Sequence, residues 1–380
     1  MPITYLQRLV LSVISLLAGF SIAAQTSIKP KYSNSTVYTG IEVGSKGVKM
    51  SVIEIGKNAQ TNGAFNILKD TSVNTDFITF SDATFAATLE GFCGFYNKAL
   101  NEYKIPSKRI FTVISSGVKM QAEKDAKISW INNLIDSFKV KIKEPQRSVE
   151  VVDVLQESKL SHLGIVPESR RFSTFLIDIG SGNTKGGFFP YGTTKDFKLF
   201  QLSWGTKSTT NAAEKNCVDD KSLVNYNRQL LRVLAGAENS EIIYAVNESG
   251  AYPVSDNIAI SGGIAWATAS LMYPDMLDNS VIPITYADLK KFNEKLYYNF
   301  GSMAPSFIAL DVKKDDREAV IKELTRVQQV FDQRALLAGT GLLLKVMRQF
   351  ESTFVGKQFF LVKNGQVGWV SAYVDDHVED

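Results

Sequence analysis

Two short segments of the sequence repeat one spacing of an acid, an aliphatic residue, a glycine, a serine, three further residues and a lysine. The members are Glu42, Gly44, Ser45 and Lys49 in the first segment, and Asp178, Gly180, Ser181 and Lys185 in the second. Backbone N–H groups in a glycine-rich turn can converge on one anion, which a Cβ would obstruct. We therefore predict phosphate binding at both turns. For one turn alone, an ordinary hairpin is the alternative.

Side chains around the second turn could add to such a site. Ser181, Asn183 and Thr184 offer hydroxyl and amide donors. Asp178 stands where the strand meets the turn, so its carboxylate could hold a metal ion or a water molecule beside the anion. The two turns thus predict a site with carboxylates, lysines and backbone donors in close reach.

Strands must flank both turns to position them. Segments rich in β-branched and aromatic residues, closed by glycine or polar turns, are typical of strands: residues 35–44, 48–56, 109–116, 150–155, 173–180 and 184–192. Apolar residues with helical periodicity predict helices over residues 83–103, 128–140, 222–236 and 317–350. This alternation predicts an α/β fold.

The repeated turn predicts two related domains that face each other across a cleft, with coincidence as the alternative. At 380 residues the chain is longer than one hydrophobic core usually organises. Residues 145–173 are the best candidate for the connection between the domains. We therefore expect a first domain over residues 37–165 and a second over residues 172–380.

The first 24 residues resemble a signal peptide. Arg8 is their only charge, an apolar run covers residues 9–20, and small residues end the segment at Ala23 and Ala24. The run is shorter than the roughly 20 residues that span a bilayer. We expect export with cleavage near Ala24 and no membrane span afterwards. A retained anchor over residues 9–24 is the alternative.

Composition excludes several kinds of chemistry. Charged residues make up 21% of the chain with a net charge of +3, so any polyanion site must be a local patch. The chain has two histidines and two cysteines, too few for a zinc cluster or for serine–histidine catalysis in an ordinary arrangement. Cys93 and Cys217 are expected to be free thiols rather than a disulfide. Carboxylates must therefore carry any chemistry.

The pair of turns resembles the phosphate loops of the actin, sugar-kinase and heat-shock-chaperone ATPase superfamily, in which two ribonuclease-H-like domains clasp phosphate groups. A third segment agrees with this resemblance. Residues 258–272 read as a strand, then Gly262 and Gly263, then a helix. A helix N-terminus of this kind offers further N–H groups to an anion.

Within that superfamily the sequence is most similar to the exopolyphosphatase and guanosine pentaphosphatase (Ppx/GppA) phosphatase family. The similarity follows the order of pieces along the chain: the first loop at residues 43–50, the segment 111–121, the segment 155–185 and the closing stretch 333–374. The closing stretch is expected to supply a helix over residues 333–350 and a final strand over residues 359–374. The resemblance covers nearly all of the chain after residue 37.

The resemblance implies roles for individual residues. Glu157 matches the catalytic glutamate that activates water, and Asp178 matches the loop aspartate that holds Mg²⁺ or orients that water. Glu42 is the second acid expected at the metal. The phosphate-binding residues implied are Gly44, Ser45, Lys46, Gly47, Lys49, Gly180, Ser181, Gly182, Asn183, Thr184, Lys185, Gly262 and Gly263.

Three residues depart from the family pattern. Glu42 replaces an aspartate, Gln156 replaces the first glutamate of a pair, and Lys185 stands where a glutamate is usual. A lysine in that place should help to bind anions but weaken the attraction of Mg²⁺. Phosphate binding should survive this change more readily than hydrolysis.

These features give one leading hypothesis and two alternatives. The leading one is an exported, Mg²⁺-dependent phosphoanhydride hydrolase that releases terminal phosphate from polyphosphate or a related substrate. The alternatives are a phosphate- or nucleotide-binding protein with weak turnover and an actin-like ATPase. Nothing in the sequence indicates nucleic-acid binding, and a homodimer is possible.

Overall fold

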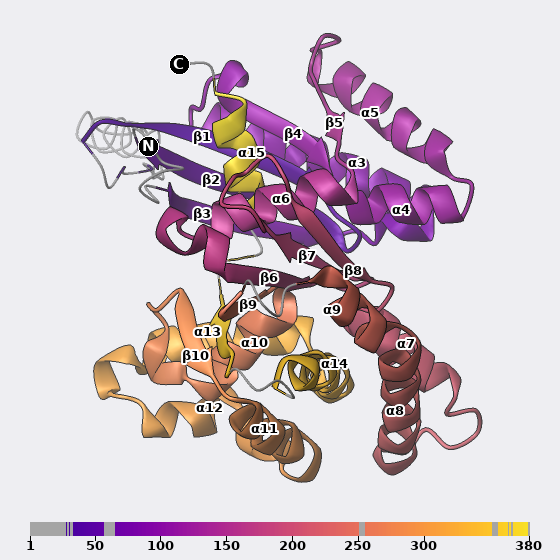
Figure 1. Cartoon of the computed structure of the whole chain (residues 1–380). Helices are drawn as coiled ribbons and strands as arrows, with labels where there is room; N and C mark the ends of the chain where they lie inside the picture. The colour runs from indigo at the N-terminus through magenta and orange to yellow at the C-terminus, as the bar shows by residue number, and fades with distance from the viewer. Residues whose placement is uncertain are drawn as a thin grey trace, which may run out of the picture.

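The computed structural model describes residues 33–56, 65–250, 255–351, 356–363 and 368–378, together with residues 28, 30 and 365. The chain forms two β-sheets, each covered by helices (Figure 1). The α/β fold class predicted from the sequence is confirmed. The predicted signal peptide, residues 1–24, lies outside the described residues.

The first sheet has the strand order β3-β2-β1-β4-β5. Its three long strands form an antiparallel meander, and β4 and β5 continue the sheet in parallel with β1. The strands are β1 (Ser35–Val43), β2 (Gly47–Gly56), β3 (Phe65–Asn74), β4 (Ile110–Ile114) and β5 (Glu150–Val151).

The second sheet repeats this plan and adds one edge strand, in the order β10-β11-β9-β6-β7-β8. Its strands β6, β7 and β8 form the meander, and β9 and β11 run parallel to β6. The strands are β6 (Thr174–Ile179), β7 (Thr184–Phe188), β8 (Lys198–Leu202), β9 (Asn257–Ser261), β10 (Val281–Ile284) and β11 (Gln358–Val362). The same order and directions in both sheets agree with the predicted relation between the two halves.

Helices cover the sheets on both sides. Those around the first sheet are α3 (Asp82–Asn97), α4 (Ser116–Lys124), α5 (Ile128–Ile142) and α15 (Gly368–Asp376), and α6 (Val154–Ile165) packs against α15 and against β7 of the second sheet. Those around the second sheet are α7 (Thr206–Lys215), α8 (Leu223–Ala237), α9 (Ile243–Ser249), α10 (Gly263–Met272), α11 (Tyr286–Tyr298), α12 (Pro305–Ile308), α13 (Arg317–Val330) and α14 (Gln333–Glu351). Among the described residues, no helix is long and apolar enough to span a membrane.

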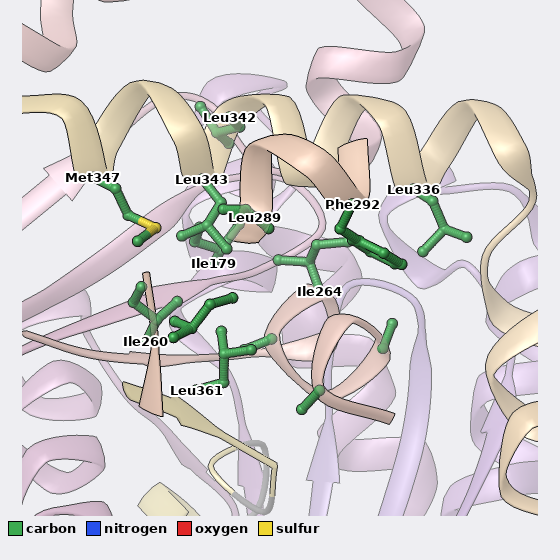
Figure 2. Packing of buried hydrophobic residues seen from close by; sticks show 14 of the residues in the cluster. Ile179, Ile260, Ile264, Leu289, Phe292, Leu336, Leu342, Leu343, Met347 and Leu361 are labelled. Atoms are coloured by element: carbon green, nitrogen blue, oxygen red, sulfur yellow. The ribbon is translucent and has the colours of Figure 1, made fainter. Parts of the chain in front are cut away.

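The larger hydrophobic core lies between the second sheet and α14. Figure 2 shows Leu343 and Met347 of α14 pointing toward Ile179 of β6 and Ile260 of β9. All four side chains are buried. Because Ile179 immediately precedes the second glycine turn, this packing fixes the strand end from which the turn projects.

The end of the chain returns to the first sheet. Helix α15 packs against α6 and β1 (Figure 1). Its side chains Trp369 and Tyr373 share a core with Ile53 and Val113. The expectation of a final strand is therefore correct for β11 but wrong for α15. The predicted second domain, residues 172–380, thus contains a helix that packs with the first half.

The longest predicted helix is two helices. Residues 317–350 form α13 and α14, which are separated by Phe331 in an extended conformation. Asp332 then accepts a hydrogen bond from the backbone N–H of Ala335 at 2.8 Å, which is the capping arrangement typical of a new helix start. The predicted strand 150–155 is also shorter, because Val154 already begins α6.

Both cysteines are free thiols, as expected, with Cys217 buried and Cys93 partly buried. The sequence did not indicate strands β3, β8 and β10. Strand β3 completes the first meander beside β2, and β8 does the same beside β7. Each glycine turn therefore belongs to a three-stranded meander that supports it from the side of the second strand.

Candidate functional site

A cleft of about 470 Å³ lies between the two sheets, and both glycine turns line it. The first turn joins β1 to β2, and the second joins β6 to β7. The start of α10 reaches the same cleft through Gly262 and Gly263. Three glycine segments that are far apart in the sequence thus face one space.

The first hairpin places an acid directly opposite a lysine. Glu42 of β1 pairs in register with Lys49 of β2. The turn is closed by a hydrogen bond of 2.8 Å from the N–H of Gly44 to the carbonyl of Gly47, and by the reciprocal bond of 3.2 Å. This closure keeps the turn tight and leaves Ser45 and Lys46 at its tip.

The second hairpin repeats this arrangement. Asp178 of β6 pairs in register with Lys185 of β7, and the N–H of Gly180 donates to the carbonyl of Asn183 at 3.0 Å. The carbonyl of Ser181 accepts from the N–H of Lys207 at 2.7 Å, so the start of α7 holds the turn from behind. The repeated sequence spacing therefore produces the same acid–lysine pair in both sheets.

The third glycine segment approaches the second hairpin closely. Gly262 has a φ of 95°, and a Cβ there would lie 2.2 Å from the carbonyl oxygen of Ile179. Neighbouring Ser261 donates its hydroxyl to a carboxylate oxygen of Asp178 at 3.0 Å. Only glycine combines this backbone conformation with this contact, so Gly262 lets β9 and α10 support Asp178.

Glu157 enters the cleft from the first turn of α6. Asp153 caps that helix, because its carboxylate accepts from the N–H of Gln156 at 2.7 Å. The carboxylate of Glu157 is buried and accepts a hydrogen bond from the N–H of Ser116 at 2.7 Å. Its other oxygen forms an ion pair with the ammonium group of Lys185. Glu157 is thus oriented from two sides.

Burial and close charges shift the pKa values of the central groups. Burial raises the pKa of the Glu42 carboxyl to about 7, although Lys49 opposes the shift. Burial also raises the pKa of Asp178 against the attraction of Lys185. For Lys185, burial alone would lower the pKa, but Glu157 and Asp178 outweigh it and hold the pKa above its ordinary value. Lys185 is therefore fully charged at neutral pH.

Two more cations lie near the first turn. Lys46 lies over the ring of Phe331 at 5.4 Å, which connects the first turn to the segment between α13 and α14. Burial and the nearby Lys207 lower the pKa of Lys46. Lys207 itself pairs with Asp76 at 3.1 Å. An anion near Lys46 and Lys207 would relieve their repulsion.

Comparison with solved structures decides the fold. The Ppx/GppA family member of Aquifex aeolicus matches with a TM-score of 0.60 and 17% identity, over 91% of this chain and 100% of that one. An exopolyphosphatase from Cytophaga hutchinsonii matches with a TM-score of 0.52 and 14% identity, over 90% and 98%. This chain has the Ppx/GppA fold. No protein-family model matches the sequence, and no curated protein is significantly similar to it.

The Ppx/GppA fold confirms the resemblance inferred from the sequence, at the level of structure. In this fold, nearly all of the predicted site residues lie around the same cleft. Those that line the cleft are Glu42, Gly44, Ser45, Lys46, Gly47, Lys49, Glu157, Asp178, Gly180, Ser181, Gly182, Asn183, Lys185, Gly262 and Gly263. Their predicted roles in catalysis and in binding stay predictions.

Two residues singled out from the sequence lie elsewhere. The buried hydroxyl of Thr184 donates to the carbonyl of Trp204 at 2.7 Å, so it supports β7 and does not line the cleft. Gln156 donates to Glu150 at 2.8 Å and is also absent from the cleft lining. Its replacement of an acid therefore leaves the charge of the cleft wall unchanged, whereas Lys185 changes it directly.

Sequence reasoning missed three sets of contacts around the cleft. They are the N–H of Ser116, the hydroxyl of Ser261, and the ion pair between Lys207 and Asp76. Ser116 had one available signal, because it is the last residue of a predicted strand and precedes a helical segment. The other contacts join segments that only the folded chain brings together.

The residues of the cleft do not fit a protein-held Mg²⁺ ion well. Among the described residues, no three His, Cys, Asp or Glu side chains are grouped so that they could hold a metal. Both oxygens of Glu157 already face N–H groups. Glu42, with a pKa of about 7, is only partly ionised at neutral pH. The ammonium group of Lys185 also repels a second cation beside Glu157 and Asp178.

Proposed function

We propose that this chain is a phosphoanhydride hydrolase that binds the phosphate groups of its substrate between the two glycine turns. The observation that carries the proposal is the placement of Glu157. Its buried carboxylate lies in the wall of a cleft to which both turns contribute, and it is oriented by Ser116 and Lys185. The similarity to solved Ppx/GppA structures supports the same reaction class.

The proposed reaction is attack of water on a terminal phosphorus atom. Each carboxylate oxygen of Glu157 has a second lone-pair direction, so it can accept a hydrogen bond from the attacking water and then its proton. The bond from phosphorus to the bridging oxygen breaks, and the charge that develops on the phosphate oxygens is stabilised by lysines and backbone N–H groups. Positioning and charge neutralisation supply most of the catalysis in such reactions.

The proposed substrate is polyphosphate or another polyphosphorylated anion. The sequence resemblance predicts Mg²⁺ for this chemistry, but the cleft does not offer donors suited to it. Export through residues 1–24 is part of the proposal, and an exported protein meets little nucleotide. Polyphosphate is therefore preferred over a nucleoside triphosphate.

A second candidate function is phosphate binding without turnover. The ion pair between Lys185 and Glu157 favours it, because one oxygen of the proposed base is already occupied by an ammonium group. The same lysine strengthens the attraction of the cleft for anions. The two candidates share the binding site and differ only in whether Glu157 activates water.

Phosphate release from polyphosphate, ATP and guanosine pentaphosphate tests the proposal. The wild type is compared with Glu157→Gln, and Glu248→Gln serves as control because Glu248 is exposed on α9. We expect turnover of at least one substrate, with a loss of about 100-fold or more in Glu157→Gln, the range typical for a general base. Tight binding of polyphosphate without release would support the second candidate. If the protein neither binds polyphosphate nor releases phosphate, both candidates are overturned.

A further inference from the structure

Lys185 is one of the residues that line the cleft. It is in register with Asp178 across the second hairpin, and its ammonium group is paired with Glu157 on α6. The side chain is about one-tenth exposed. Because strand β7 and helix α6 are both packed in the fold, the side chain of Lys185 is held in place before any ligand binds.

Three carboxylates surround Lys185 in its electrostatic environment. Glu157, Asp178 and Glu42 all line the cleft and all act electrostatically on Lys185. A divalent cation in a phosphate site does two things: it neutralises carboxylates of this kind and attracts phosphate oxygens. Lys185 is already placed to do the first.

The ammonium group also retains capacity for the second. It has three N–H donors, and the hydrogen bond described for it goes to Glu157. Its remaining donors can reach oxygens of an anion in the cleft. Lysine is a compact point charge that binds phosphate in this way in other phosphate sites.

We propose that Lys185 is a built-in replacement for the divalent cation, so that this cleft binds phosphate chains without Mg²⁺. The inference rests on the proposed function, because it concerns the same site and the same class of ligand. The proposed function requires hydrolysis. This inference requires only that phosphate binds to the cleft without a metal ion, whether or not hydrolysis follows.

The test is calorimetric binding of inorganic tripolyphosphate to the full chain, once with EDTA and once with Mg²⁺. We expect the two dissociation constants to agree within about threefold, which is less than 1 kcal/mol. Lys185→Glu should bind about 100-fold more weakly in EDTA, the loss expected for a charged contact replaced by a repulsive one. It should recover part of this affinity with Mg²⁺, because the variant restores a carboxylate that attracts the metal.

Two further variants keep the test decisive if Lys185→Glu does not fold. Lys185→Arg retains the charge and should bind in EDTA, whereas Lys185→Gln lacks it and should bind at least about tenfold more weakly. Lys198→Glu is the matched control, because Lys198 is exposed on the neighbouring strand β8, opposite Phe188 at the far end of β7. It should bind as the wild type does.

The outcomes separate this inference from the proposed function. Wild-type binding only when Mg²⁺ is present overturns the role of Lys185 and leaves the proposed function standing. Equal binding by Lys185→Gln and Lys185→Arg in EDTA also overturns it. No binding of tripolyphosphate in either condition overturns the proposed function itself.

Discussion

The carboxylate of Glu157 and the ammonium group of Lys185 form a buried ion pair that joins α6 to β7. Glu157 is 2% exposed and Lys185 is 8% exposed. The pair therefore connects the two halves of the chain, and both residues line the cleft. Because the desolvation of each charge is offset chiefly by the other, loss of one partner should be costly.

Replacing Lys185 with Met should lower the free energy of unfolding by about 3–5 kcal/mol, because Glu157 would remain buried without its counter-charge. The double variant with Glu157→Gln should be more stable than the single variant, since Gln still accepts a hydrogen bond from Ser116 and carries no charge. Urea unfolding of the wild type, both single variants and the double variant measures the coupling. A coupling energy near zero would show that the pair does not stabilise the fold.

Gly262 is predicted to be irreplaceable even by Ala. The new Cβ would lie 2.2 Å from the carbonyl oxygen of Ile179 and 2.9 Å from Asp178, and the φ of 95° disfavours Ala. We expect destabilisation of at least about 1–3 kcal/mol and weaker phosphate binding, because Asp178 must move. Thermal unfolding and tripolyphosphate calorimetry measure the two effects.

Gly94 provides the matched control for that substitution. It is an exposed residue within α3, and a Cβ there would contact nothing within 4 Å. Gly94→Ala should therefore raise stability by up to about 1 kcal/mol, as expected for a helix interior. Equal effects of the two substitutions would contradict the role assigned to Gly262.

The sequence predicted the two glycine hairpins better than it predicted the surrounding elements. The spacing of acid, glycine and lysine from Asp178 to Lys185 predicts a hairpin from the local sequence alone. The pairing of Asp178 with Lys185 across β6 and β7 confirms this hairpin. The pairing of Lys185 with Glu157 could not be predicted, because it depends on how α6 packs against β7. Local turn chemistry is encoded nearby in the chain, whereas packing between distant elements is not.

Helix α15 shows why one closing element was misjudged. Its residues Gly368–Val374 are buried on every side, so the apolar pattern has no polar face. A short apolar run with Val and Tyr is equally typical of a buried strand. Tertiary packing against α6 decides the outcome, and no residue in the segment signals it.

Lys46 is predicted to recognise phosphate groups beyond the first. It lies at the tip of the first turn, over Phe331, and is repelled by Lys207. Lys46→Ala should weaken the binding of tripolyphosphate by about tenfold and reduce its salt dependence, while orthophosphate binding changes less. Calorimetry at two salt concentrations measures both. Lys195→Ala, at an exposed position, is the control, and an equal loss in that variant would contradict a specific role.

His162 should make the stability of this fold sensitive to acid. It lies in α6, where its Nε2–H donates to the carbonyl of Thr174 at 2.9 Å and its ring meets that of Phe189 edge-on. Burial lowers its pKa from 6.5 to about 4, and nearby Arg171 contributes in the same direction. Protonation would place an uncompensated charge in the core that holds α6 on the second sheet.

The sign of this effect follows from proton binding. The unfolded chain takes up a proton at His162 near pH 6.5, whereas the folded chain does so only near pH 4, so stability falls as the pH decreases between these values. From pH 7.5 to pH 5 the wild type should lose about 2 kcal/mol more than His162→Gln, which retains a donor but does not titrate. Urea unfolding at both pH values measures this difference. Parallel losses in the two proteins would show that His162 is not the group responsible.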